Sequence, residues 1–140
     1  MRYKFLKHTA DIKFQAFGKS LEEVFESAAY ALANIISKDK IKNRIKEEVS
    51  MQIKGADKER LLCDFLEEFL FLFETKGFLL SSIKKLNIEE KSGAYFLKGD
   101  VFGDKADDYE LDNHVKAITY NEMFVKQVGD KFICQVVVDV

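Results

Sequence analysis

The sequence predicts an α+β domain in two layers, with a mostly antiparallel sheet and two helices packed on one face of it. One observation is that apolar residues recur at helical spacing in two segments, residues 21–36 and the stretch between Asp57 and Gly77. Another is that most other segments alternate apolar and polar residues with a period of two, which is typical of half-buried strands. The third is the order of these segments: strand, strand, helix, strand, helix and then a run of strands.

A capping-box pattern predicts where the first helix begins. Residues 3–7 and 12–16 precede it and are expected to form two short strands. Ser20 and Glu23 have the spacing of a capping box, in which the serine hydroxyl accepts a hydrogen bond from the backbone N–H three residues on. A helix is therefore expected over residues 21–36.

The second helix is expected to be buried on more than one side. Residues 41–48 before it are charged and are expected to form a loop, and residues 49–53 alternate as a strand with one wet face. Asp57 is the expected N-cap, and Gly77 is well placed just beyond the C-terminal end. Between them, apolar residues cover more than half of the helix circumference.

The second half of the chain is expected to consist of strands. The candidates are residues 82–90, with an irregularity at Lys84-Lys85, then 94–102, 114–120, 123–128 and 132–138. Lys91-Ser92-Gly93 and Gly129-Asp130 are hairpin signals, and residues 103–108 form a polar loop. Because the last strand is largely apolar on both faces, it should lie at the centre of its sheet.

Composition narrows the class of protein. The 140 residues, of which 47% are hydrophobic and 33% charged, fit a single folded domain spanning 1–140. The formal charge of −2 gives no general attraction to nucleic acid, so any RNA is expected to be held by another macromolecule.

Cys63 and Cys134 lack metal-ligand spacing and are expected to be reduced core thiols in a cytoplasmic protein. There is no signal-peptide pattern and no apolar run of about 20 residues that would span a membrane.

Two aspartates are the strongest candidates for a site. Asp11 lies in the polar cluster His8-Thr9-Ala10-Asp11, and Asp139 follows an apolar strand, one residue before Val140. If Asp11, Asp139 and the terminal carboxylate of Val140 converge, their repulsion raises a pKa or recruits a hard cation such as calcium or magnesium. The alternatives are an ordinary turn or cap for Asp11 and a solvated chain end for Asp139.

The other candidate side chains are basic. His8 is either a general acid or base or a structural histidine, and Lys116 either extends along apolar neighbours into water or contacts a phosphate or a partner. His114 has no partner visible in the sequence. The sequence contains no glycine-rich phosphate loop, G-x-S-x-G or H-E-x-x-H motif. A metal-dependent phosphoester hydrolase with His8 as base is a less favoured alternative, since it requires an open metal position for water.

Three segments together resemble the archease family. They are His8-Thr9-Ala10-Asp11-Ile12 with Gly18-Lys19-Ser20-Leu21-Glu22-Glu23, then Val115-Lys116-Ala117-Ile118-Thr119-Tyr120, and finally Val136-Val137-Val138-Asp139-Val140. The resemblance implies a non-enzymatic accessory protein of the GTP-dependent RNA ligase of tRNA splicing, which promotes ligase guanylylation and turnover. It also implies a chaperone-like role in tuning a tRNA methyltransferase as an alternative function.

The resemblance also implies a metal site and a functional lysine. Family members bind a divalent metal, often calcium, and the ligands match Asp11, Asp139 and a carbonyl or carboxylate oxygen of Val140. The family's functional lysine matches Lys116. Two positions depart from the family pattern. Asn121 replaces a histidine, which puts in doubt a contact with the ligase, and Phe132 replaces an aromatic residue that is commonly tryptophan.

Overall fold

The computed structural model of the chain describes residues 1–7, 10–42 and 45–140. In these ranges it contains two α-helices, seven strands and one 3-10 turn. The elements are β1 (Tyr3–Leu6), β2 (Ile12–Gly18), α1 (Leu21–Ile36), β3 (Ile45–Gly55), α2 (Lys58–Lys76), β4 (Phe78–Lys91), β5 (Ala94–Lys105), η1 (Ala106–Asp108), β6 (Ala117–Val128) and β7 (Lys131–Asp139). The α+β class with antiparallel strand pairing is confirmed.

Both helices begin and end where the sequence predicts. The Ser20 hydroxyl accepts a hydrogen bond of 3.1 Å from the backbone N–H of Glu23, and α1 runs from residue 21 to residue 36. The Asp57 carboxylate accepts a bond of 2.7 Å from the Arg60 N–H at the start of α2. Gly77 ends α2 in the left-handed conformation with φ +63°, which glycine adopts without strain.

The strands form two sheets rather than the single sheet that was expected. The four-stranded sheet has the order β1-β2-β7-β6, and the three-stranded sheet has the order β3-β5-β4. The prediction that the last strand is central is confirmed, because β7 pairs with β2 on one side and β6 on the other. The same period-two pattern would suit one sheet or two, which is why the division could not be seen in the sequence.

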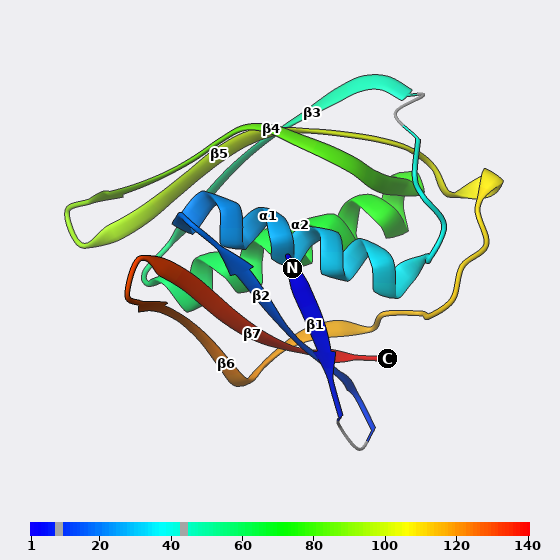
Figure 1. Cartoon of the computed structure of the whole chain (residues 1–140). Coiled ribbons are helices and arrows are strands. Elements are labelled where there is room, and N and C mark those ends of the chain that lie inside the picture. Colours follow the sequence, from blue (N-terminus) through cyan, green and yellow to red (C-terminus); the bar gives the residue numbers. More distant parts are fainter. Residues whose placement is uncertain (8–9, 43–44) are drawn as a thin grey trace.

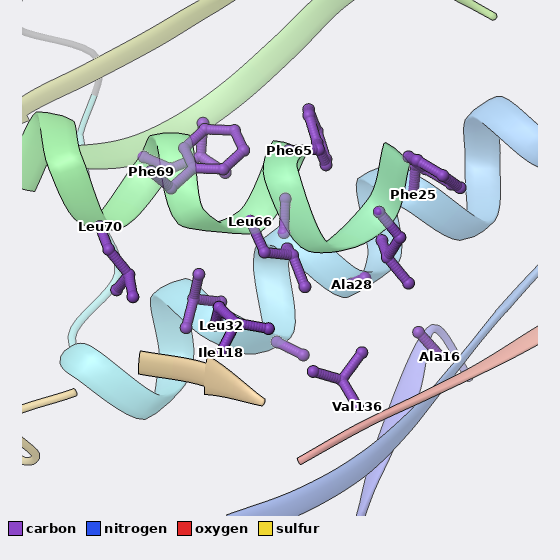
Figure 2. Packing of buried hydrophobic residues seen from close by; sticks show 14 of the residues in the cluster. Ala16, Phe25, Ala28, Leu32, Phe65, Leu66, Phe69, Leu70, Ile118 and Val136 are labelled. Atoms are coloured by element: carbon purple, nitrogen blue, oxygen red, sulfur yellow. The ribbon is translucent and has the colours of Figure 1, made fainter. Parts of the chain in front are cut away.

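The helices lie between the two sheets, as Figure 1 shows. Both of them contribute to one apolar cluster that also contains inward-facing residues of both sheets. In Figure 2, Val136 of β7 points toward Leu32 of α1, while Phe65 and Phe69 of α2 lie on the far side of the helix pair. The extensive apolar surface of α2 is thus explained, since this helix packs against strands of both sheets as well as α1.

Several strand boundaries differ from the expected ones. β3 begins at Ile45, inside the segment expected to be a loop, and its register with β5 shifts before Val49. β5 continues to Lys105, and η1 then occupies the end of the expected polar loop. Residues 114–120 and 123–128 were expected as separate strands. They belong to one strand that begins at Ala117 and is interrupted by an irregularity between Thr119 and Phe124.

The two predicted hairpins are confirmed. Ser92 and Gly93 both have positive φ between β4 and β5, as a tight two-residue turn requires, and Gly129 has positive φ between β6 and β7. The expected irregularity near Lys84-Lys85 is a register shift between Lys84 and Asn87, with Lys85 at φ 57°. No helix in the described part of the chain is long and apolar enough to cross a membrane.

Candidate functional site

The two candidate aspartates lie at the same end of the four-stranded sheet. The register pairs Ile12 of β2 with Val138 of β7, so Asp11 and Asp139 are the next residues on these two neighbouring strands. On the other side of β7, Asp139 pairs with Ala117 of β6. In Figure 1, the red end of the chain lies beside the blue strands β1 and β2. The fold therefore brings residues 11 and 139, from opposite ends of the chain, to the end of the sheet where β7 stops. We call this end of the four-stranded sheet, with Asp11, Asp139 and Val140, the acidic edge.

Lys116 is tied to this edge through its backbone. Its N–H donates a hydrogen bond of 2.8 Å to the carbonyl oxygen of Asp139. The strand begins one residue later, so Lys116 enters the sheet at the point where β7 ends. Its side chain is exposed, whereas the neighbouring Val115 is buried. Lys116 is thus a solvent-accessible cation beside Asp139, on the opposite side of β7 from Asp11.

The donor atoms at this edge fit a hard cation by type. Asp11, Asp139 and Val140 are each half-buried, so they remain accessible from solvent. The main-chain carbonyl of Asp139 already accepts the Lys116 N–H. The oxygens suited to a metal are therefore the two carboxylates and those of Val140. Within residues 1–7, 10–42 and 45–140, no three His, Cys, Asp or Glu side chains come together as a metal-binding group. A site here would depend on main-chain or terminal oxygen as well as on carboxylates.

The remaining candidates are placed differently. His8 lies outside the described residues. Asn121, which replaces the family histidine, is exposed and its N–H donates to the Thr119 hydroxyl at 3.3 Å. Phe132 is half-buried near the start of β7, where it pairs with Gly18, far along the strand from Asp139. The structure therefore brings Asp11, Asp139, Val140 and Lys116 to one edge and leaves Phe132 at the opposite one.

A pocket beside Asp11 was not foreseen from the sequence. It encloses about 390 Å³ between β1, the start of β2, the end of α1 and the segment before β6. Its apolar lining includes Phe5, Ile12 and Ile35, and its polar lining includes Asp11 and Lys38. Because these residues come from four separate segments, no local sequence pattern indicates the pocket. Phe5 is 46% exposed, so the pocket carries an accessible aromatic side chain next to the acidic edge.

A buried carboxylate away from this site was also missed. Asp104 was assigned to a polar loop, but it lies in β5 and is only 4% exposed. It accepts hydrogen bonds from the Tyr109 hydroxyl at 2.5 Å and from the Lys105 N–H at 2.8 Å. The Tyr109 hydroxyl in turn accepts the Lys42 N–H at 3.0 Å. This group ties the segment after α1 to the end of β5, so its evident role is structural.

The two cysteines are unsuited to nucleophilic chemistry. Both Cys63 and Cys134 are buried and unpaired with each other. Burial raises the pKa of each thiol to about 12, with the Glu67 carboxylate adding to the effect at Cys63. Since the thiolate is the reactive form, neither side chain is activated near neutral pH. The expectation of reduced core thiols is confirmed for their burial and for the lack of a disulfide between them.

Fold and site together define a class: small α+β proteins in which two antiparallel sheets enclose a helix pair and the central strand ends in an acidic edge. The family model of the archease protein family matches residues 3–140. The chain therefore belongs to the archease family.

Individual relatives support this assignment over the full length. A protein archease of Methanosarcina barkeri is 42% identical over 142 residues, which cover 99% of this chain and 96% of that protein. A protein archease of Pyrococcus furiosus is 37% identical and covers 99% of each chain. The solution structure of a protein of Methanobacterium thermoautotrophicum, 31% identical, superposes with a TM-score of 0.82 over 99% of each chain.

A more distant structure shares the fold. The crystal structure of a Thermotoga maritima archease, described as a possible chaperone, has a TM-score of 0.61 and 22% identity. It covers 98% of this chain and 96% of its own. At this identity the likeness shows the fold alone.

Proposed function

We propose that the protein is a metal-binding accessory protein that activates the GTP-dependent 3′-phosphate RNA ligase of tRNA splicing. In this role it promotes guanylylation and turnover of the ligase in the cytoplasm and has no catalytic activity of its own. The proposal takes its partner from the archease resemblance, and family membership supports an accessory role.

The observation that carries the proposal is the strand register at the acidic edge. Pairing of Ile12 with Val138 and of Ala117 with Asp139 brings Asp11, Asp139 and Lys116 together from three distant parts of the chain. The residues that the resemblance singles out for metal binding and for function are thus neighbours in the fold. Carboxylate and main-chain oxygens are the ligands that calcium prefers, and this end of the sheet offers both kinds. A bound calcium ion would join the ends of the two strands.

The direct test is multiple-turnover ligation by the purified ligase with and without this protein. Asp11→Asn and Asp139→Asn keep side-chain size and remove the charge, so both are expected to abolish most of the stimulation. Asp130→Asn is the matched control, since Asp130 is exposed in the turn at the opposite end of β7. Full stimulation by both site variants would reject the role of the acidic edge. Release of phosphate from RNA or nucleotide by this protein alone would instead favour the hydrolase reading.

The oxygen supplied by Val140 can be tested separately. Calcium binding is measured by isothermal titration for the chain ending at Val140 and for a chain extended by a few glycine and serine residues. If the terminal carboxylate is a ligand, the extension is expected to weaken binding clearly. If the carbonyl of Val140 is the ligand, the extension leaves the affinity nearly unchanged.

A second candidate function is chaperone-like tuning of a tRNA methyltransferase. The observation that favours it is the pocket beside Asp11, where exposed Phe5 offers an apolar contact for a protein partner. Phe5→Ser is expected to weaken a complex with the methyltransferase in size-exclusion chromatography and to leave calcium binding unchanged. Phe71→Ser, on the exposed side of α2, is the control because Phe71 is 57% exposed and remote from this pocket in the chain. A methyltransferase that binds neither the protein nor its calcium-loaded form would remove this candidate.

A further inference from the structure

The outer face of the three-stranded sheet is open. Its inner face packs against α1 and α2, and Figure 1 shows the helices on one side only. On the other side, Gln52, Lys54, Phe96 and Lys98 are all exposed. In the described part of the chain, no helix or strand covers this side. We call it the outer β5 face, after its central strand.

Lysines are concentrated on this face. Lys54 pairs in register with Phe96, Gln52 with Lys98, and Lys84 with Asp100, so these side chains share one side of the sheet. Lys85 and Lys91 line the two hollows of the same face. Among the side chains that the structure describes, the charged ones on this face are Lys54, Lys84, Lys85, Lys91, Lys98, Glu89 and Asp100. Five lysines against two carboxylates make this described part of the face basic, although the whole chain carries a formal charge of −2.

The lysines of this face stabilise the ionised form of the neighbouring Glu89 carboxylate. Glu89 accepts a hydrogen bond from Lys91, with a separation of 3.0 Å between charged atoms. This bond lowers the pKa of Glu89, and the charges of Lys91 and Lys98 lower it further. One of the two acidic side chains is therefore held ionised and already partnered. The other, Asp100, accepts a bond of 3.2 Å from the Ser50 hydroxyl.

Aromatic rings are interleaved with the lysines. Phe96 and Phe102 lie on the outer side of β5, six residues and about 20 Å apart along the strand. The Lys54 ammonium lies 5.5 Å from the Phe96 ring centre, and that of Lys84 lies 5.4 Å from the Phe102 ring centre. Phe96 is 38% exposed, so its ring is accessible from solvent.

The face is also hollowed at Phe96. One depression of about 480 Å³ is lined by Phe96, Lys54, Lys98 and the amide side chains of Gln52 and Asn87. A second of about 210 Å³ continues from Lys98 toward Lys85. The larger volume is in the range of small-ligand sites. Ring, ammonium groups and amides thus surround one open hollow that continues along the sheet.

We propose that the outer β5 face binds single-stranded RNA, with a base stacked on Phe96 and phosphates held by Lys54, Lys98 and Lys84. Sheets that bind single-stranded RNA combine these two elements, aromatic platforms for bases and basic side chains for the backbone. Base stacking is stronger than an exposed cation–π contact. An arriving base therefore displaces Lys54 from the ring, and the released ammonium becomes available to the adjacent phosphate.

The choice of RNA over DNA rests partly on the proposed function, in which the partner enzyme works on RNA. The amides of Gln52 and Asn87 supply a physical reason, since they can hydrogen-bond a 2′-hydroxyl. This inference departs from the expectation that RNA is held only by another macromolecule. That expectation used the net charge of the whole chain, which does not describe the charge of one face.

The test is binding of a fluorescent oligouridylate of about ten nucleotides by the protein alone, followed by anisotropy. Phe96→Ala is expected to weaken binding about tenfold, and Phe96→Trp is expected to retain it. Replacing Lys54, Lys84 and Lys98 together by alanine is expected to flatten the slope of log affinity against log salt by about 2. Unchanged affinity in both the Phe96→Ala and triple variants would overturn the proposal.

Matched controls come from the other sheet. On β6, the Lys126 ammonium lies 4.4 Å from the Phe124 ring centre, which is the same type of contact outside the proposed face. Lys126→Ala and Phe124→Ala are expected to leave binding unchanged, and losses equal to those of the Phe96 and lysine variants would overturn the proposal. Oligothymidylate that binds as tightly as oligouridylate would overturn the assignment to RNA. Polyglutamate that competes equally well would overturn recognition of nucleic acid.

This outcome is separable from that of the proposed function. Asp11→Asn is expected to abolish ligase stimulation and to leave RNA affinity unchanged, because the acidic edge belongs to the other sheet. Phe96→Ala is expected to do the reverse for RNA affinity measured without ligase. Stimulation without RNA binding rejects only the RNA-binding face, and RNA binding without stimulation rejects only the ligase role.

Discussion

The two sheets resemble each other on their inner faces but differ on their outer faces, one of which is covered and the other open. Each packs its inner side on the helix pair, yet the outer side of the four-stranded sheet is closed. There, Gln135 of β7 is only 9% exposed. Its side-chain amide donates a hydrogen bond of 2.8 Å to the Glu122 carbonyl oxygen and accepts one of 3.0 Å from the Gln15 amide. Lys13 completes the cover with an ion pair of 3.4 Å to Glu122. The outer β5 face has no such cover in the described residues.

The irregularity in β6 produces this difference. Between Thr119 and Phe124 the register with β7 shifts, and Glu122 adopts φ 58°. Extra residues in a strand bend it and redirect its side chains, which here brings the Glu122 backbone over Gln135. The comparison suggests that the four-stranded sheet is stabilised on both faces, whereas the three-stranded sheet keeps one face for binding.

The largest expected loss of stability comes from truncating the apolar core that both sheets share. Phe65 of α2 is fully buried and packs against Phe25 and Phe69, with ring centres 5.7 and 5.0 Å away. Phe65→Ala is expected to lower the free energy of unfolding by about 3–5 kcal/mol in urea titrations. The transition should remain single, because both sheets use this core. Phe71→Ala, on the exposed side of the same helix, should change stability by less than about 0.5 kcal/mol. Two separate transitions would show that the sheets unfold independently.

The next effect compares two glycines of β5. A Cβ on Gly103 would lie 1.9 Å from the Leu79 carbonyl oxygen, which is backbone of the adjacent strand. A Cβ on Gly99 would meet the end of the Leu86 side chain at 2.9 Å, which can move aside, and the Leu86 Cα at 3.3 Å, which requires only a small shift. Gly103→Ala is expected to cost about 3 kcal/mol or more, and Gly99→Ala about 1 kcal/mol, in chemical denaturation. Equal costs would mean that this region of the three-stranded sheet adjusts more freely than its packing indicates.

A smaller effect tests the closed and open outer faces directly. Gln135→Ala removes both amide bonds and is expected to cost about 1–3 kcal/mol. Gln52→Ala makes the same truncation on the outer β5 face and is expected to stay within about 0.5 kcal/mol. Thermal unfolding of the two variants measures the difference. A Gln52 variant as unstable as the Gln135 variant would contradict the view that only one outer face is sealed.

The smallest expected effect is the absence of a reaction. Burial raises the pKa of Cys134, in the central strand of the four-stranded sheet, to about 12. At pH 8 the thiol is therefore almost entirely protonated and is expected to resist thiol reagents in the folded protein. Labelling should become fast only when this sheet opens in urea. Rapid labelling in native buffer would mean that the four-stranded sheet opens locally despite its closed outer face.

Much of the fold was predictable from local chemistry. The cap residues Ser20 and Asp57 predicted where both helices begin. The run Val136-Val137-Val138, which is apolar on both faces of the strand, indicated a central strand. The number of sheets was not predictable, because alternation shows which side chains share a face and not which strands pair. The length of β6 was missed for a related reason, since its irregularity interrupts the alternation.

The candidate site was predictable only in part. The polar break at Asp11 and the aspartate after an apolar strand were visible, but their meeting depends on the antiparallel pairing of β2 with β7. The residues themselves suggested a cation at Asp11, Asp139 and Val140, and the archease resemblance matched them to metal ligands and Lys116 to a functional lysine. All of these roles stay predictions. The pocket beside Asp11 and the basic outer β5 face involve side chains from several segments. Short-range patterns do not reveal such groupings.

The central position of β7 also has a consequence for synthesis of the chain. β7 leaves the ribosome after the other six described strands, yet β2 and β6 both pair with it. Until then, β2 can pair only with β1, whereas β3, β4 and β5 have all emerged by residue 105 and can associate around α2. The nascent chain is therefore expected to build its three-stranded sheet first and to expose a strand edge at β2 until β7 has been synthesised. The acidic edge, which needs residues 11 and 139 together, would be assembled last.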